Sequence, residues 1–159
     1  MNKELIAELK SLRRPDPVDD SRNGFWEVSP EAVQSFENQA NVKLPPLLRK
    51  FYEEVGHGSI QQSRTGEWAE FDLNIFVDLS RLLDLYLRRD PSFEVDPEIV
   101  EQGDLAFFDM GSHSYLVVRP LSSKPDAIYW PYETQSVYSS VWDFADQLLE
   151  NPRCYLESR

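Results

Sequence analysis

The sequence is poor in the residues from which disulfides, metal sites and most catalytic centres are built. It contains one cysteine, two histidines and six glycines in 159 residues. The single Cys154 has no second cysteine to pair with, and with only His57 and His113 in the chain it cannot complete a Cys/His zinc site. We therefore expect no disulfide, no metal and no cofactor.

Long hydrophobic runs and the common catalytic motifs are also missing. No stretch approaches about 18 consecutive apolar residues, and the first ten residues lack the apolar segment of a signal peptide. There is no Gly-x-Ser-x-Gly elbow, no His-Glu-x-x-His pair and no phosphate-binding glycine loop. These absences favour a cytoplasmic protein that does not enter a membrane and is not an enzyme.

Basic residues are few relative to acidic ones, 16 against 28, which gives a net charge of −12. Residues 67–109 alone hold 12 acidic and three basic residues, so most of the charge lies in the middle of the chain. Because a negative field repels phosphate backbones, direct binding of DNA or RNA is disfavoured and a basic protein partner is favoured. The alternative is that the acidity only keeps the protein in solution.

Apolar spacing and turn residues predict a single α+β domain, in which helices pack against a mostly antiparallel sheet. The gaps between the later strands are too short for helical crossovers, so those strands should be antiparallel. We divide the chain into an N-terminal amphipathic helix and loop, residues 1–27, packed on a main domain, residues 28–159. Helices are expected at 3–13, 30–40, 45–55, 78–88 and 141–150, strands at 71–76, 105–109, 114–119, 127–130 and 136–138, and a short extended piece at Phe25–Trp26.

The aromatic residues suggest where a partner binds. Alternation along the strands should bury about half of the aromatic side chains within them. Trp68 differs, because it lies in the polar run GEWAEFD, and the run WPYE at 130–133 has a similar aromatic and acidic character. Exposed aromatics among carboxylates suit a binding surface for a basic protein, although Trp68 could equally be partly buried under a loop. The candidate partner-binding residues are Glu67, Trp68, Glu70, Asp72, Asp109, His113, Tyr132 and Glu133.

An enzymatic alternative would use Asp104, Asp109 and His113, which fall on or beside one predicted hairpin. Both aspartates have the neighbours of turn residues that bond their own backbone, Gly103 before the first and Met110-Gly111 after the second. A histidine without a matched partner supplies no mechanism. The same reasoning places His57, between two glycines, at a helix end or in a loop.

Several runs, taken in order, resemble the SUKH superfamily, which includes bacterial immunity proteins and fungal cell-wall-assembly regulators. The similar segments cover roughly residues 28–150, although His57 and the acidic stretch around 90–104 depart from the family pattern. The resemblance implies a protein that neutralises a toxin, nucleases being among the toxins of the family, or else a regulatory scaffold for endogenous partners. It rests on LPPLLRKFYEEVGHGSI (44–60), FVDLSRLLDL (76–85), LAFFDMGSHSYLVVR (105–119) and SSVWDFADQLLE (139–150).

Overall fold

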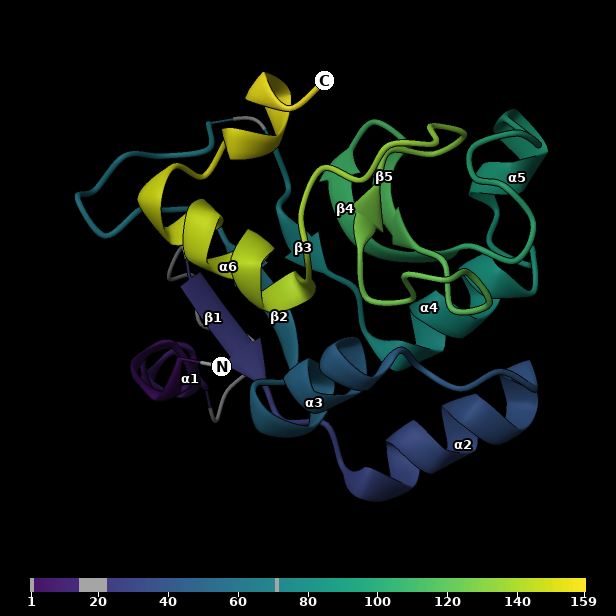
Figure 1. Ribbon diagram of the computed structural model, residues 1–159, viewed down its shortest axis with the longest axis horizontal. Coiled ribbons are helices and arrows are strands. Elements are labelled where there is room, and N and C mark those ends of the chain that lie inside the picture. Colours follow the sequence, from purple (N-terminus) through teal and green to yellow (C-terminus); the bar gives the residue numbers. More distant parts are fainter. Residues whose placement is uncertain (1, 15–22, 71) are drawn as a thin grey trace.

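The described part of the chain is built around a six-stranded antiparallel sheet in which every strand pairs with the next one in sequence (Figure 1). A computed structural model describes residues 2–14, 23–70 and 72–159. The strands are β1 (Asn23–Trp26), β2 (His57–Ile60), β3 (Ile75–Phe76), β4 (Leu105–Gly111), β5 (Ser114–Val118) and β6 (Ile128–Tyr129). The predicted α+β class and the antiparallel pairing of the later strands are confirmed.

Six α-helices and one 3-10 helix surround this sheet within the described residues. They are α1 (Lys3–Ser11), α2 (Pro30–Ala40), α3 (Pro46–Glu54), α4 (Leu79–Tyr86), α5 (Ser92–Val95), α6 (Val141–Glu150) and the 3-10 helix η1 (Cys154–Glu157). None of the helices in this part of the chain combines the length and the apolar composition needed to cross a bilayer.

Local signals determine where the longer helices begin. The Ser29 hydroxyl accepts a hydrogen bond from the Ala32 N–H at 3.1 Å, ahead of Pro30 in the first turn of α2. The carboxylate of Asp78 accepts from the Arg81 N–H at 2.9 Å and caps α4 in the same way. Ser140 caps α6. These caps explain why the expected helix starts agree with the structure.

The main core lies between the sheet and the helices, and aromatic rings dominate its centre. Phe51 of α3 stacks on Phe76 of β3 with ring centroids 4.9 Å apart. Phe108 of β4 meets Phe144 of α6 edge to face at 4.7 Å. Helices that are distant in sequence are thereby fixed to neighbouring strands.

Strands β4 to β6 are buried on both faces. Their second face carries a smaller apolar cluster made with Leu85 of α4 and with Ile99 and Val100 from the segment between α4 and β4, which covers this end of the sheet (Figure 1). The expectation that about half of the strand aromatics are buried was wrong, because this second layer leaves no solvated face. All five are at least nine-tenths buried: Phe107, Phe108, Tyr115, Trp130 and Tyr138.

Strand β3 is shorter than predicted. The expected strand at 71–76 is reduced to Ile75–Phe76, because Asn74 adopts a left-handed conformation (φ 48°) that breaks the alternation. Leu73, expected on the buried side, is 42% exposed, and Phe71 lies outside the described residues.

Strand β2 was not expected, since its sequence HGSI has low strand propensity. Its single glycine allows unusually close packing against β1: a Cβ on Gly58 would lie 2.0 Å from the carbonyl oxygen of Gly24. His57 therefore begins a strand rather than ending a helix, and its ring lies beside Trp26 with centroids 5.8 Å apart.

The N-terminal segment packs against the rest of the chain. Leu5 and Leu9 of α1 belong to the main core, and β1 forms the edge of the sheet. The guanidinium of Arg13 donates hydrogen bonds to the carbonyls of Glu54 at 2.6 Å and Val55 at 3.2 Å, where α3 ends. These bonds satisfy carbonyl groups that a helix end leaves unpaired.

Candidate partner-binding surface

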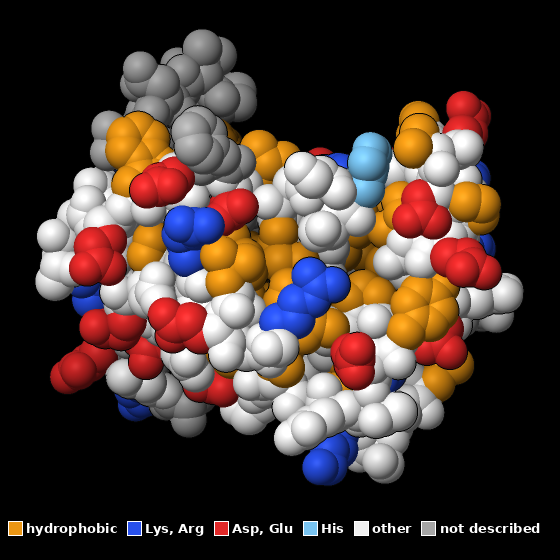
Figure 2. Space-filling model, turned by 90° about the horizontal axis from the view of Figure 1, so that it is seen from above, with side chains coloured by type: hydrophobic (Ala, Val, Ile, Leu, Met, Phe, Trp, Pro, Cys, Tyr) orange, Lys and Arg blue, Asp and Glu red, His pale blue; other side chains and the backbone are white. Residues whose placement is uncertain are grey.

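A cavity of about 630 Å³ opens beside the β4–β5 turn, between the residues that follow β6 and the C-terminal segment. Ile99, Tyr115 and Trp130 contribute apolar surface to its wall, and His113, Glu133 and Arg159 contribute charged or polar groups. Figure 2 shows the molecule from the side of the C terminus: hydrophobic side chains line a hollowed centre, and charged side chains stand around it. A concave, partly apolar surface of this kind is the usual form of a binding site.

The wall of this cavity is held in place by a partly buried ion pair, which contacts Tyr115. Tyr115 accepts a hydrogen bond from the guanidinium of Arg81 at 2.8 Å, and the same guanidinium pairs with the Asp109 carboxylate at 2.6 Å. Burial raises the pKa of the Tyr115 hydroxyl, so Tyr115 stays neutral. The arrangement fixes the aromatic wall before any partner arrives.

Asp109 was expected on the surface, and the structure places it inside. Asp109 is only 3% exposed. One carboxylate oxygen pairs with Arg81, and the other accepts a hydrogen bond from the Gly111 N–H at 2.7 Å. Because its charge is neutralised and buried, Asp109 supports the β4–β5 turn and is not available to contact a partner.

The loop between β2 and β3 carries four of the other expected residues. Glu67 is exposed and Trp68 is 43% exposed, as a contact residue requires. Glu70 and Asp72 both lie against the guanidinium of Arg153, at 3.7 and 3.3 Å. Their charge is thus partly compensated within the chain.

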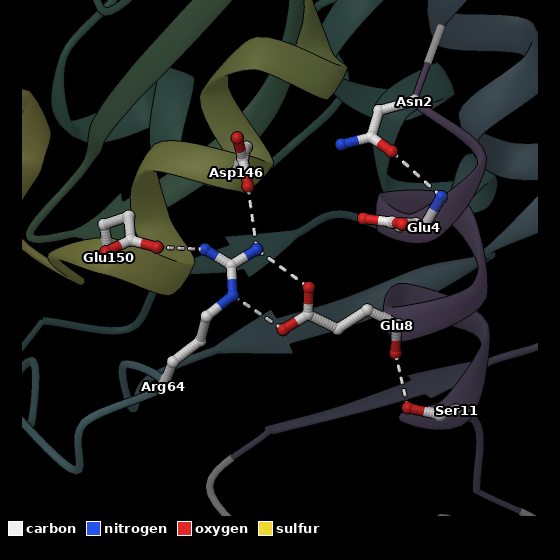
Figure 3. A network of polar contacts seen from close by, with 7 residues as sticks. All are labelled: Asn2, Glu4, Glu8, Ser11, Arg64, Asp146 and Glu150. Atoms are coloured by element: carbon white, nitrogen blue, oxygen red, sulfur yellow. Dashed lines mark hydrogen bonds and ion pairs between the residues drawn. The ribbon is translucent and has the colours of Figure 1, made fainter.

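A network around Arg64 ties this loop to two helices. Figure 3 shows the guanidinium of Arg64 between Glu8 of α1 and Asp146 and Glu150 of α6. It donates two hydrogen bonds of 2.8 Å to Glu8, one of 2.7 Å to Asp146, and one to Glu150. Hydrogen bonding to Glu8, followed by that to Asp146 and Glu150, raises the pKa of Arg64. The base of the loop that presents Trp68 is therefore anchored.

The expected residues accordingly fall into two groups that the C-terminal segment connects. Arg153 contacts the group on the β2–β3 loop, whereas Arg159 lines the cavity together with His113 and Glu133. Tyr132, 52% exposed, directly precedes Glu133. No single patch brings all eight together.

A set of exposed acids near Tyr132 was missing from the expected site. Partial burial and then the carboxylate charge of Glu98 raise the pKa of Tyr132, with smaller contributions from Glu101 and Asp96. These three acids and Glu94 are exposed, and within the described residues none of them forms an ion pair. The sequence signal was the acidic stretch around 90–104, which contains no basic residue.

The residues of the enzymatic alternative do not converge. Asp104 precedes β4 and pairs with Arg119 at 3.4 Å, while Asp109 lies near the other end of the same strand, roughly 16 Å away at about 3.3 Å per residue. His113 is exposed in the β4–β5 turn. Nowhere in the described ranges are three His, Cys, Asp or Glu side chains grouped so that they could hold a metal ion.

Comparison with known proteins identifies the family. Residues 27–147 match the model of the SMI1/KNR4 family (SUKH-1). The chain belongs to this family. One SUKH relative, from Bacillus subtilis (strain 168), is named Immunity protein YxxD and is 32% identical over 138 residues, which cover 85% of this chain and 89% of the relative. No solved structure gives a significant match. The resemblance drawn from the sequence is therefore confirmed.

Proposed function

We propose that this protein is an immunity protein, which binds a cognate toxin and blocks its action. The proposal rests on the membership of the chain in the SUKH-1 family and on its similarity to a relative that is named as an immunity protein. A function of this kind requires a binding surface and no catalytic residues. The cavity and the exposed side chains around it provide such a surface.

The chemistry of this surface favours a basic toxin, such as a nuclease. Glu98 and Glu101 are exposed, form no ion pair within the described chain, and lie close in sequence to Ile99 of the cavity wall. An acidic surface accelerates association with a basic protein and competes for the positive groups with which a nuclease holds phosphates. Tyr132 and Trp68 supply exposed aromatic surface, which most often contributes the larger share of binding energy.

The proposal can be tested by co-expressing the protein with the products of neighbouring genes, purifying any complex and asking whether the partner is toxic on its own. A toxic partner that is neutralised in the complex supports immunity. Stable partners that are not toxic would instead indicate the regulatory scaffold, and an adjacent toxin-encoding reading frame would argue against that alternative.

Matched charge reversals then locate the interface. Glu98→Lys with Glu101→Lys should slow association with the toxin severalfold and weaken its salt dependence, because long-range attraction is lost. Glu27→Lys with Glu31→Lys changes the net charge equally but at the start of α2, on the far side from the C terminus (Figure 1). If both pairs slow association equally, only net charge matters and the acids near Tyr132 are not the docking surface. Trp68→Ala should mainly speed dissociation.

A further inference from the structure

The cavity already holds a cation supplied by the protein itself. The guanidinium carbon of Arg159 lies 4.9 Å from the centroid of the Trp130 ring. Tryptophan is the aromatic side chain that attracts cations most strongly, and arginine is its most frequent partner. The Trp130 wall of the cavity therefore already contacts a guanidinium group.

The cavity lining and the residues close to it in sequence carry more acidic than basic side chains. Glu133 lines the cavity with Arg159, and Glu98 and Glu101 stand on either side of the lining residue Ile99 without an ion pair in the described chain. Besides Arg159, the charged residue in the lining is the acid Glu133. The other titratable side chains in the lining are those of His113 and Tyr115. A negative surround with an aromatic wall suits a guanidinium from another molecule.

We propose that this cavity recognises an arginine side chain of the partner, and that Arg159 occupies its place in the free protein. The inference rests on the proposed function, to which it adds the chemistry of one contact: the toxin inserts an arginine against Trp130 and displaces Arg159. Trp130 is 8% exposed and held in the core, so the wall is in place before binding. Its indole N–H is buried and finds no acceptor among the described residues.

If Arg159 occupies the cavity, it competes with an arginine added from outside. The apparent affinity for the added arginine is then the intrinsic affinity multiplied by the fraction of molecules in which the cavity is free. If Arg159 occupies the site in about nine molecules of ten, removing it should tighten binding of an added arginine about tenfold. When Arg159 is already replaced by alanine, Glu133→Gln should weaken binding of the added arginine, because it removes the carboxylate from the lining without changing the size of the side chain. Glu133 is exposed, and its contact with Arg119 uses the main-chain carbonyl, so this change should leave the fold intact.

The probe is N-acetyl-arginine N-methylamide, titrated into ¹⁵N-labelled protein while the assigned indole N–H resonance of Trp130 is followed by NMR. The matched control is N-acetyl-citrulline N-methylamide, which has nearly the same shape and no charge. We expect the arginine compound to shift the Trp130 resonance, with a dissociation constant at least threefold lower for Arg159→Ala than for the wild type, and at least threefold higher when Glu133→Gln is added to Arg159→Ala than for Arg159→Ala alone. Equal shifts with citrulline, no shift at all, or an unchanged constant in Arg159→Ala would overturn the proposal.

Failure of this inference is distinguishable from failure of the proposed function. If a toxin is neutralised and its affinity is the same for the wild type, Arg159→Ala and Glu133→Gln, the immunity function stands and the arginine contact is refuted. If no toxin is found but the arginine compound binds as described, the pocket stands and the immunity function is in question.

Discussion

Asn74 connects three segments of the chain through one buried side chain, and its replacement by alanine should be among the most damaging single changes. Its amide nitrogen donates to the carbonyl of Ile60 at 3.0 Å and to that of Pro152 at 2.6 Å. Its amide oxygen accepts from the hydroxyl of Tyr155 at 2.6 Å. The side chain is fully buried, so water does not replace these partners.

The expected loss has two parts. Three buried hydrogen bonds, at about 1 kcal/mol net each, contribute roughly 3 kcal/mol to stability. The backbone of Asn74 has a φ of 48°, a region that asparagine tolerates better than alanine, which adds roughly 1 kcal/mol. Asn74→Ala should therefore destabilise the protein by about 4 kcal/mol, a large share of the roughly 5–15 kcal/mol typical of a domain.

Two further variants separate these parts. Asn74→Gly loses the hydrogen bonds but relieves the backbone, so it should be less destabilising than Asn74→Ala by about 1 kcal/mol despite the added flexibility of the unfolded chain. Asn74→Asp keeps the acceptor for Tyr155 but aims a carboxylate at two carbonyls, and it should be worse at pH 7 than at pH 4 relative to the wild type. Urea unfolding followed by tryptophan fluorescence and circular dichroism gives the free energies. A loss below about 1 kcal/mol for Asn74→Ala, with an unchanged denaturant slope, would refute the reasoning.

Three other predictions concern the scaffold. Arg64→Met leaves three carboxylates facing one another, so it should destabilise by about 1 kcal/mol, and the loss should shrink in high salt when urea unfolding is repeated there. Gly58→Ala should destabilise by more than about 2 kcal/mol because its Cβ would overlap the Gly24 carbonyl, whereas Gly66→Ala, whose nearest neighbour would lie at 3.8 Å, should lose only about 1 kcal/mol in the same assay. Burial lowers the pKa of His57, opposed by Asp78, so the unfolded chain binds the proton more readily and stability should fall as pH drops below about 6.5; His57→Gln should flatten this slope, and an identical slope would contradict it.

The five longer helices could be predicted from the sequence because their signals are local, whereas the short α5 and η1 were not expected. Ser29, Asp78 and Ser140 each cap a helix whose apolar stripe follows within one turn. Short strands carry no such signal. The residues of β2 form a strand because β1 and β3 lie on either side of it, and a pairing between residues about 35 positions apart cannot be read from a single run.

The burial of β4 on both faces is a second feature that was not predicted from the sequence. Its continuous apolar run LAFF (105–108) is typical of a strand that is covered on both faces. Recognising this would have required knowing that the segment before it, which contains Ile99 and Val100, folds back over the sheet. That segment is punctuated by prolines and acids, and its few apolar residues have no regular spacing that would reveal a layer.

The candidate surface was harder to predict than the fold because a formal charge and an available charge are different quantities. Of the 12 acids in residues 67–109, half form ion pairs with arginines in the described chain. Asp109 looked like a steering charge and is instead neutralised by Arg81, whereas Glu98 and Glu101 form no ion pair in the described chain. Long-range attraction depends on the charge left after such pairing. A count along the sequence could therefore locate the acidic half of the molecule but not the carboxylates that a basic partner would meet, which depend on where the fold places each arginine.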